Sequence, residues 1–282
     1  MLGKLRRAKA NPAPYVHKWL RVLTRKDQLP LSWRLWLGQR VGAQTASRFR
    51  SLYVVTYGRS GSTLTTSYLS HLPGIDLKGE NYLFPLPGYE AEQRLVAART
   101  KPYGHRDETT SPWYGAHKFD REVWRRDVLH AMLNQLYPQQ LIPPTIGFKE
   151  IRWDRGQVFE EFDAVLQWLT SLRAPGGVVF LKRDLDAVMK SAWWAEKTEA
   201  EQRENRQRLT ELEARMDAYQ TAHPGDAITI TYEAFTSGPA EAARLCAWLG
   251  LPFDESVWRA TLDAKHSYQP GDRKDSTAET SN

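Results

Sequence analysis

Residues 52–64 read LYVVTYGRSGSTL, a β-branched apolar run that breaks into a turn rich in glycine and serine. The run predicts a buried strand over Leu52–Tyr57, and the residues after Gly61 predict a helix that begins at Ser62. A strand, turn and helix start of this kind directs several backbone N–H groups and the positive end of a helix dipole toward one point. The segment is therefore expected to bind a phosphate.

The glycine spacing of this turn disfavours two common nucleotide-binding loops. A Walker A loop needs a Gly-Lys pair, which Gly58 and Gly61 do not supply, so an ordinary ATPase is disfavoured. A dinucleotide-binding fingerprint needs a third glycine at the G-x-G-x-x-G spacing, and none follows. The turn instead places Arg59 to reach past the first phosphate, with the hydroxyl and N–H groups of Ser62 and Thr63 beside it. A plain Gly-Ser turn is the structural alternative.

A second strand and helix start occupies residues 177–191. Gly177–Leu181 is a short apolar run typical of a buried parallel strand, and Arg183 follows where that strand meets a helix. Because ligands of open α/β sheets bind outside the carboxyl ends of the strands, Arg183 can present its planar guanidinium to a phosphate. Ser191, about two helical turns later in the following helix, can add a hydroxyl. A surface Arg-Asp pair is the alternative interpretation.

Together the two segments resemble those of sulfotransferases that use 3'-phosphoadenosine 5'-phosphosulfate (PAPS). Gly58–Leu64 is similar to the family's 5'-phosphosulfate loop, in the arginine form typical of bacterial, carbohydrate and tyrosylprotein enzymes. Residues 183–191 are similar to the family's 3'-phosphate segment. The resemblance implies that PAPS is bound without a metal and leaves as adenosine 3',5'-bisphosphate. The implied donor-binding residues are Gly58, Arg59, Ser60, Gly61, Ser62, Thr63, Arg183, Ser191 and Tyr232.

Between these motifs, two segments are similar to the family's reaction centre. Arginine-type members carry a Gly-Glu where this chain has Gly79-Glu80, which implies that Glu80 is the general base for the acceptor hydroxyl. Lys149 is similar to a lysine that relatives place near the transferring group, where a cation stabilises developing negative charge. The implied catalytic set is thus Glu80, Arg59 and Lys149. A solvated loop glutamate and an edge strand with alternating charges are the alternatives.

The chain departs from the family pattern at several positions. Lysine-type members have a histidine base just after a strand lysine, but here Lys149 is followed by Glu150, which favours Glu80 as the base. His105 and His117 remain alternative bases. Because neighbours on a strand alternate faces, Glu150 and Arg152 are expected to point away from Lys149.

Tyr232 is assigned by resemblance alone. It matches a Tyr-Glu that family members carry after a late strand, where the tyrosine lies near the adenine base. A core aromatic with a satisfied hydroxyl is an equally good interpretation.

The whole chain has the composition of a globular protein. It has 282 residues, of which 41% are hydrophobic and 26% charged, and its single cysteine excludes an internal disulfide. No apolar run reaches about 18 residues, and Asn11–Pro14 interrupts the basic start, so a cytoplasmic location is expected. Strands that alternate with helices predict an α/β, P-loop-like three-layer fold with a central parallel β-sheet flanked by helices.

The expected organisation is a basic N-terminal arm over residues 1–50, a sulfotransferase domain over 51–270 and a flexible tail over 271–282. Residues of about 82–144, rich in proline and aromatic side chains, are expected to form a long irregular insertion that binds the acceptor. The remaining expected elements are a strand near Ile146, a helix at Asp184–Trp194, a charged helix from about Glu196 to Ala222, a strand at Ala227–Thr231 and a helix at Pro239–Leu249.

Charge is concentrated in the N-terminal arm. The first 50 residues hold 12 lysines and arginines against the single acid Asp27, a net charge of +11, which leaves −5 for the rest of a chain of net charge +6. Tryptophans alternate with cations in Lys18–Leu23 and Ser32–Leu37, as in segments that lie on membrane surfaces. An acidic glycan or nucleic acid would attract the same residues, although we expect no nucleic-acid partner for this protein. A helical layer packed on the domain by its apolar stripe, with the cations outward, is the structural alternative.

The predicted activity is transfer of sulfonate from PAPS to a hydroxyl by in-line displacement. Eleven tryptophans and the arginine-type loop favour a glycan or glycolipid acceptor, or another small hydroxylated metabolite. The alternatives are a divergent P-loop nucleotide kinase and a noncatalytic nucleotide-binding protein. A kinase would require magnesium, and a noncatalytic protein would tolerate loss of Glu80. Neither the acceptor nor the oligomeric state follows from the sequence.

Overall fold

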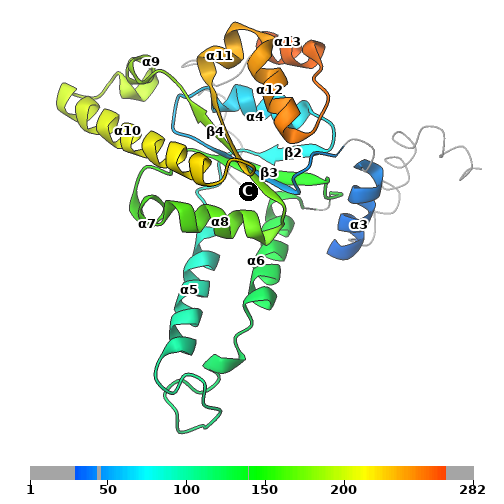
Figure 1. Ribbon diagram of the computed structural model, residues 1–282, viewed down its shortest axis with the longest axis vertical. Coiled ribbons are helices and arrows are strands. Elements are labelled where there is room, and N and C mark those ends of the chain that lie inside the picture. The colour runs from blue at the N-terminus through cyan, green and yellow to red at the C-terminus, as the bar shows by residue number, and fades with distance from the viewer. Residues whose placement is uncertain (1–28, 43–45, 139, 265–282) are drawn as a thin grey trace, which may run out of the picture.

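The computed structural model describes residues 29–42, 46–138 and 140–264 (Figure 1). Within this part of the chain, five strands form one sheet in the order β2-β3-β1-β4-β5, and every neighbouring pair is parallel. The strands are β1 (Ser51–Val55), β2 (Ile75–Lys78), β3 (Thr145–Glu150), β4 (Gly176–Lys182) and β5 (Ala227–Thr231). The predicted central parallel sheet is therefore confirmed.

Helices cover both faces of the sheet. They are α3 (Leu31–Gly42), α4 (Ser62–His71), α5 (Leu86–Thr100), α6 (Arg121–Leu136), α7 (Gly156–Glu160), α8 (Phe162–Leu172), α9 (Leu185–Met189), α10 (Glu199–Ala222), α11 (Tyr232–Ser237), α12 (Pro239–Leu249) and α13 (Glu255–Asp263). Two short 3-10 helices, η1 (Ala116–Lys118) and η2 (Ala192–Trp194), complete the set in the described ranges.

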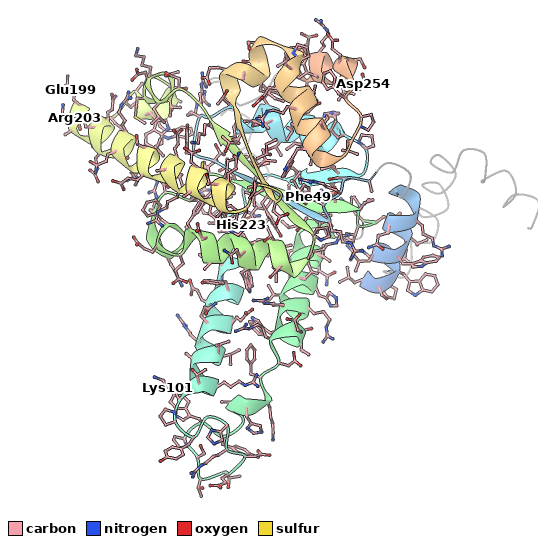
Figure 2. The ribbon with its side chains drawn as sticks, in the orientation of Figure 1. Phe49, Lys101, Glu199, Arg203, His223 and Asp254 are labelled. Carbon is pink, nitrogen blue, oxygen red and sulfur yellow. The ribbon has the colours of Figure 1, made fainter. Side chains whose placement is uncertain are left out.

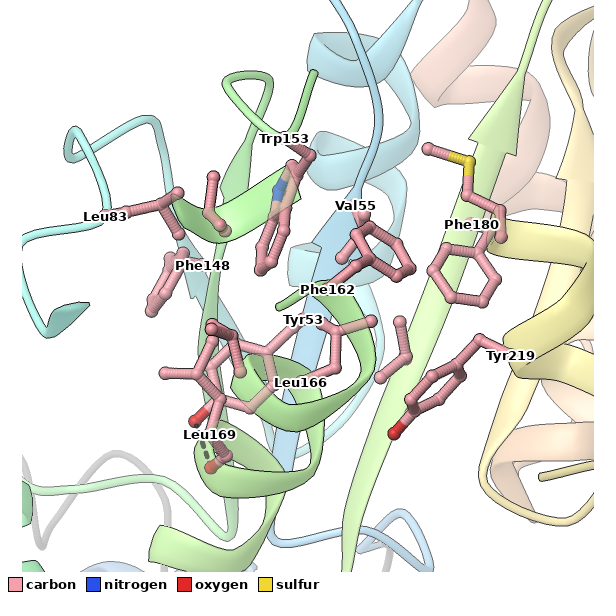
Figure 3. Packing of buried hydrophobic residues seen from close by; sticks show 14 of the residues in the cluster. Tyr53, Val55, Leu83, Phe148, Trp153, Phe162, Leu166, Leu169, Phe180 and Tyr219 are labelled. Atoms are coloured by element: carbon pink, nitrogen blue, oxygen red, sulfur yellow. Dashed lines mark hydrogen bonds between the residues drawn. The ribbon is translucent and has the colours of Figure 1, made fainter. Parts of the chain in front are cut away.

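The alternation of side chains along β1 explains the three layers. Tyr53 and Val55 enter one hydrophobic cluster, whereas Leu52 and Val54 enter the other. The first cluster is covered by α8 and α10, and Figure 3 shows its aromatic packing, including the hydrogen bond from the Tyr53 hydroxyl to the carbonyl of Leu169. The second is covered by α4, α12 and α13. Both faces are buried, which is why these strands have near-continuous apolar sequences.

Residues 82–144 differ from the expected irregular insertion, because they contain two long helices. Helices α5 and α6 lie side by side and extend away from the sheet, with η1 and the connection after Lys101 at their far end (Figures 1 and 2). We call residues 86–136 the helical projection. Glu92, which is 1% exposed, holds it together by accepting from Arg125 of α6 at 2.8 Å and from Trp168 of α8 at 2.8 Å.

The expected helix at Asp184–Trp194 is also corrected, since it is broken into α9 and η2. Ser191 lies between them with an extended backbone (φ −107°, ψ 130°), and Ala192 has a positive φ of 48°. The turn carries the Ser191 side chain back toward the loop after β1, where a continuous helix would not place it.

Other expectations concern residues at the two ends of the chain. Helix α3 contacts the domain: Arg34 donates to the carbonyl of Gln140 at 2.8 Å, and Leu31 and Leu35 pack against the first hydrophobic cluster. Lys18–Leu23 and the tail at 271–282 lie outside the described residues. Among the described helices, none combines the length and the apolar character needed to cross a membrane.

Candidate active site

The predicted site residues gather because each follows, or ends, a strand of one parallel sheet. The carboxyl ends of parallel strands share one edge. The loop at residues 56–61 follows β1, Glu80 follows β2, and Lys149 is the penultimate residue of β3. Arg183 directly follows β4, and Tyr232 directly follows β5. All five described strands therefore contribute to a single edge.

The loop after β1 is shaped by two close approaches. Gly61 has a left-handed φ of 86°, and a Cβ there would lie 2.1 Å from Cδ2 of Tyr232. A Cβ on Gly58 would lie 2.8 Å from Cζ2 of Trp193. No side chain caps the N-terminus of α4. Its first-turn N–H groups are therefore oriented as in an anion-binding helix start.

The two arginine-bearing corners are in direct contact. Nε of Arg59 donates to the Ser191 hydroxyl at 3.0 Å, and Nη1 of Arg183 donates to the carbonyl of Arg59 at 3.0 Å. The Arg183 guanidinium also lies over the Tyr232 ring, 4.4 Å from its centroid. Arg59 itself has a φ of 69°, an uncommon conformation for a residue with a side chain. The residues predicted for the two phosphates are thus close enough for one nucleotide to contact both.

Polar groups in this corner fit a doubly phosphorylated ligand. Within the described ranges, the buried hydroxyl of Ser60 and the buried Nε of Arg183 have no hydrogen-bond partner. Buried polar groups are normally paired, so each is a candidate donor to a bound oxygen. A guanidinium carries five N–H donors, so the contacts above leave others of Arg59 and Arg183 for phosphate oxygens.

Glu80 and Lys149 form an ion pair at the neighbouring strand ends. Nζ of Lys149 donates to Oε1 of Glu80 at 2.6 Å, and the lysine side chain is 7% exposed whereas the glutamate is 33% exposed. Arg152 donates to the other oxygen, Oε2, at 3.2 Å. A carboxylate has about four lone-pair positions, so Glu80 can still accept a hydrogen bond from a further donor on its exposed side.

The expected orientation of Glu150 and Arg152 is wrong for Arg152. Strand alternation holds only within β3, which ends at Glu150, and the chain then turns Arg152 back to the same carboxylate that Lys149 contacts. Glu150 is fully buried. Its Oε1 accepts from the N–H groups of Ile151 and Arg152 and from the Arg152 guanidinium at 2.7 Å.

The second oxygen of Glu150 holds the loop that carries Glu80. Its Oε2 accepts from the backbone N–H of Asn81 at 3.1 Å and of Leu83 at 3.2 Å. One buried carboxylate therefore joins the end of β3 to the segment after β2. Sequence reasoning did not identify this role, although an acid directly after a strand lysine is a visible signal.

Tyr57 and Glu213 are further site-supporting residues that the sequence did not reveal. The Tyr57 hydroxyl accepts from the backbone N–H of Arg183 at 2.9 Å and donates to Oε1 of Glu213 at 2.5 Å. Burial, together with the hydrogen bond to Glu213, raises the pKa of Tyr57 well above its ordinary value, so its hydroxyl stays protonated. The bond joins the loop after β1 to the residue after β4, and α10 supports both.

The alternative bases lie elsewhere. His117 belongs to η1, at the far end of the helical projection, where its Nε2 is 3.6 Å from Asp107 (Figure 1). His105 lies in the same connection between α5 and η1 and is exposed. In the described ranges, no group of three or more His, Cys, Asp or Glu side chains is arranged to hold a metal ion.

Comparisons with known proteins give one family. The family model described as "Sulfotransferase family" matches residues 51–255. No curated protein matches the chain.

Matching solved structures include the sulfotransferase domain of an olefin synthase from Synechococcus PCC 7002, with 18% identity and a TM-score of 0.45 over 73% of this chain and 74% of that chain. Another is the sulfotransferase domain of the curacin biosynthetic pathway, with 15% identity and a TM-score of 0.45 over 73% and 75%. Sulfotransferase STF1 from Mycobacterium tuberculosis H37Rv has 12% identity and a TM-score of 0.35 over 84% and 77%.

Proposed function

This chain belongs to the sulfotransferase family, and we propose that it transfers the sulfonate group of PAPS to a hydroxyl of a glycan, a glycolipid or another small hydroxylated metabolite. The observation that carries the choice of donor is the direct contact of Arg183 with the carbonyl of Arg59, whose side chain also donates to Ser191. A donor with phosphate at both ends matches two adjacent arginine corners better than a triphosphate held at one loop does.

The proposed roles follow from position. The N–H groups of Gly58–Thr63 and the hydroxyl of Ser60 hold the 5'-phosphosulfate end, whereas Arg183 and Ser191 hold the 3'-phosphate. Tyr232 supports Arg183 beside the adenine base. PAPS supplies the sulfonate group and a good leaving group.

Glu80 is proposed to remove the proton of the acceptor hydroxyl as its oxygen bonds to sulfur and the bond from sulfur to the leaving phosphate breaks. Arg59, Lys149 and the N–H groups of the loop stabilise the negative charge that develops on the sulfonyl and leaving oxygens. The Lys149–Glu80 distance of 2.6 Å supports this arrangement, because it puts base and cation on one reacting centre. No metal is proposed, since fixed cations supply the electrostatic stabilisation.

We also propose a cytoplasmic location, with a peripheral contact at the inner membrane surface. This contact depends on the N-terminal arm and α3, and not on the donor site. The choice of a carbohydrate or glycolipid acceptor is supported by the arginine form of the loop and by exposed aromatic side chains such as Tyr82, which is 77% exposed.

Calorimetric titration with adenosine 3',5'-bisphosphate and with ATP tests the donor. We expect the wild type to prefer the bisphosphate, and Arg183→Ala to bind it about 10- to 100-fold more weakly because charge-assisted contacts to phosphate are lost. Arg203→Ala is the matched control, since Arg203 is an exposed arginine of α10 whose partner Glu199, at 3.7 Å, is exposed as well. Preference for ATP, or equal affinities of the Arg183 and Arg203 variants, would contradict the assignment.

A further inference from the structure

Helix α3 faces the domain with Arg34, Gly38 and the partly buried Leu31 and Leu35, and it exposes both of its tryptophans. Trp33 is 57% exposed and Trp36 is 47% exposed, whereas Arg34 is 7% exposed. A surface helix that only packs on its domain is expected to turn its large indoles toward the domain together with its leucines. The exposed pair therefore needs an explanation beyond core packing.

The orientation of α3 is fixed by the buried side. Nε of Arg34 donates to the carbonyl of Gln140 at 2.8 Å, and its guanidinium also bonds to Asn134 at 3.1 Å and to the carbonyl of Tyr137. Gly38 lies so close to the domain that a Cβ there would be 1.9 Å from the carbonyl oxygen of Ile142. The helix cannot rotate to hide Trp33 and Trp36 without breaking these contacts.

The exposed side is aromatic and basic. The rings of Trp33 and Trp36 are 6.0 Å apart and edge to face, and together with Ser32 they line a hollow of about 300 Å³. The Arg40 guanidinium lies over the Trp36 ring at 4.4 Å. The sequence of α3, LSWRLWLGQRVG, contains no acidic residue.

The sequence before α3 adds a strong net positive charge. Residues 1–28 contain eight lysines and arginines and one acid, Asp27, and they include the apolar pairs Trp19-Leu20 and Val22-Leu23 between cations. Indole rings favour the boundary between lipid headgroups and acyl chains, and basic residues are attracted to anionic lipids. We propose that α3 and residues 1–28 bind an anionic membrane surface, with Trp33 and Trp36 entering the headgroup layer.

Charge and composition favour this occupant over the others. A second copy of the chain would bring two segments of net charge +7 together, which is repulsive. Nucleic acid would satisfy the cations but not the aliphatic residues that separate them. The proposal does not depend on the donor or on the identity of the acceptor, although it agrees with a glycolipid acceptor.

Co-sedimentation of the full chain with vesicles tests the proposal. We expect binding to vesicles of phosphatidylcholine with roughly 30% phosphatidylglycerol, weaker binding at high salt, and little binding to phosphatidylcholine alone. The double variant Trp33→Ser/Trp36→Ser should bind at least about tenfold more weakly. The matched control Trp113→Ser/Tyr114→Ser removes exposed aromatic side chains from the helical projection, 37% and 50% exposed, and should bind like the wild type.

Circular dichroism and urea unfolding show whether each variant is folded, and Arg40→Glu provides a second variant that should also weaken vesicle binding. Equal vesicle binding by the wild type and the tryptophan variant would overturn the proposal, as would negligible binding by the wild type. The proposal would also be overturned if the wild type formed a dimer or bound a labelled oligonucleotide, and the tryptophan variant lost that interaction but still bound vesicles. Loss of nucleotide binding in the wild type would affect the proposed function alone.

Discussion

At Gly61, backbone conformation and space both select glycine. Its φ is 86°, and a Cβ would meet the Tyr232 ring at 2.1 Å. Gly61→Ala is expected to destabilise the fold by about 1–3 kcal/mol, because the left-handed conformation is strained. It should also weaken nucleotide binding, because Tyr232 must move and Arg183 lies over that ring at 4.4 Å. Urea unfolding and calorimetry with adenosine 3',5'-bisphosphate measure the two effects.

Gly115→Ala separates strain from contact. Gly115 has nearly the same φ, 87°, but no atom lies within 4 Å of a Cβ placed there. This variant should lose stability and keep its nucleotide affinity. If both variants retained full affinity, the contact between Gly61 and Tyr232 would have no part in the donor site.

Glu80→Gln tests the proposed base. The amide keeps the shape of the side chain but cannot take a proton, so turnover should fall by roughly two to four orders of magnitude while affinity for adenosine 3',5'-bisphosphate is unchanged. Asp76→Asn is the control, because Asp76 on β2 forms a similar pair with Lys78 at 2.8 Å and is 31% exposed. Unchanged turnover in Glu80→Gln would move the role to another group, of which His117 is the next candidate.

Among the elements, the end of β3 and the loop after β2 depend on Glu150. Its buried carboxylate accepts the N–H groups of Asn81 and Leu83. Glu150→Ala leaves these groups without their acceptor, which should cost at least about 2 kcal/mol of unfolding free energy. Because the loop carries Glu80, turnover should fall more than donor affinity. Urea unfolding, steady-state kinetics and hydrogen exchange of residues 79–85 provide the measurements.

Glu150→Gln is the conservative companion, since its remaining carbonyl oxygen can keep part of the network. It should recover some of the protection of residues 79–85 that Glu150→Ala loses. Unchanged exchange in the alanine variant would show that the loop is held by other contacts.

Elements with local signals were predicted best from the sequence. Helix α4 begins at Ser62 after Gly61, and α12 spans Pro239–Leu249 between a proline and Gly250, both as expected. Helix α10 begins at Glu199 and not at Glu196, and the Thr198–Glu201 capping box is the signal that marks its start. The four-residue β2 was missed because pairing with β3, 70 residues later at Ile75–Thr145, makes it a strand.

For the candidate site, the sequence indicated individual residues but not the contacts that join them. Arg59 and Arg183 could be found because each follows an apolar strand. The hydrogen bond between Tyr57 and Glu213 joins residues 156 positions apart in the sequence, so no local sequence pattern could predict it. Arg152 was assigned to the wrong side because alternation was extended past the end of β3.

On the scale of the whole molecule, the described donor-site candidates and the far end of the helical projection lie apart (Figure 1). The projection is held to the domain through Glu92 and Trp168, near its base. The prediction that residues 82–144 bind the acceptor therefore divides into two. Either the start of this segment, beside Glu80, or its far end contacts the acceptor.

Tyr82 favours the first of these. It is 77% exposed, and its ring lies 3.8 Å from the guanidinium of Arg152, which in turn contacts Glu80 at 3.2 Å. The exposed ring therefore offers an acceptor a face for stacking near Glu80. Tyr82→Ala should raise the KM for the acceptor by about tenfold with a smaller change in kcat, since ground-state binding is lost. Trp113→Ala, in the connection between α5 and η1, should leave both unchanged in steady-state kinetics with varied acceptor. A larger effect of Trp113→Ala than of Tyr82→Ala would instead assign acceptor binding to the far end of the projection.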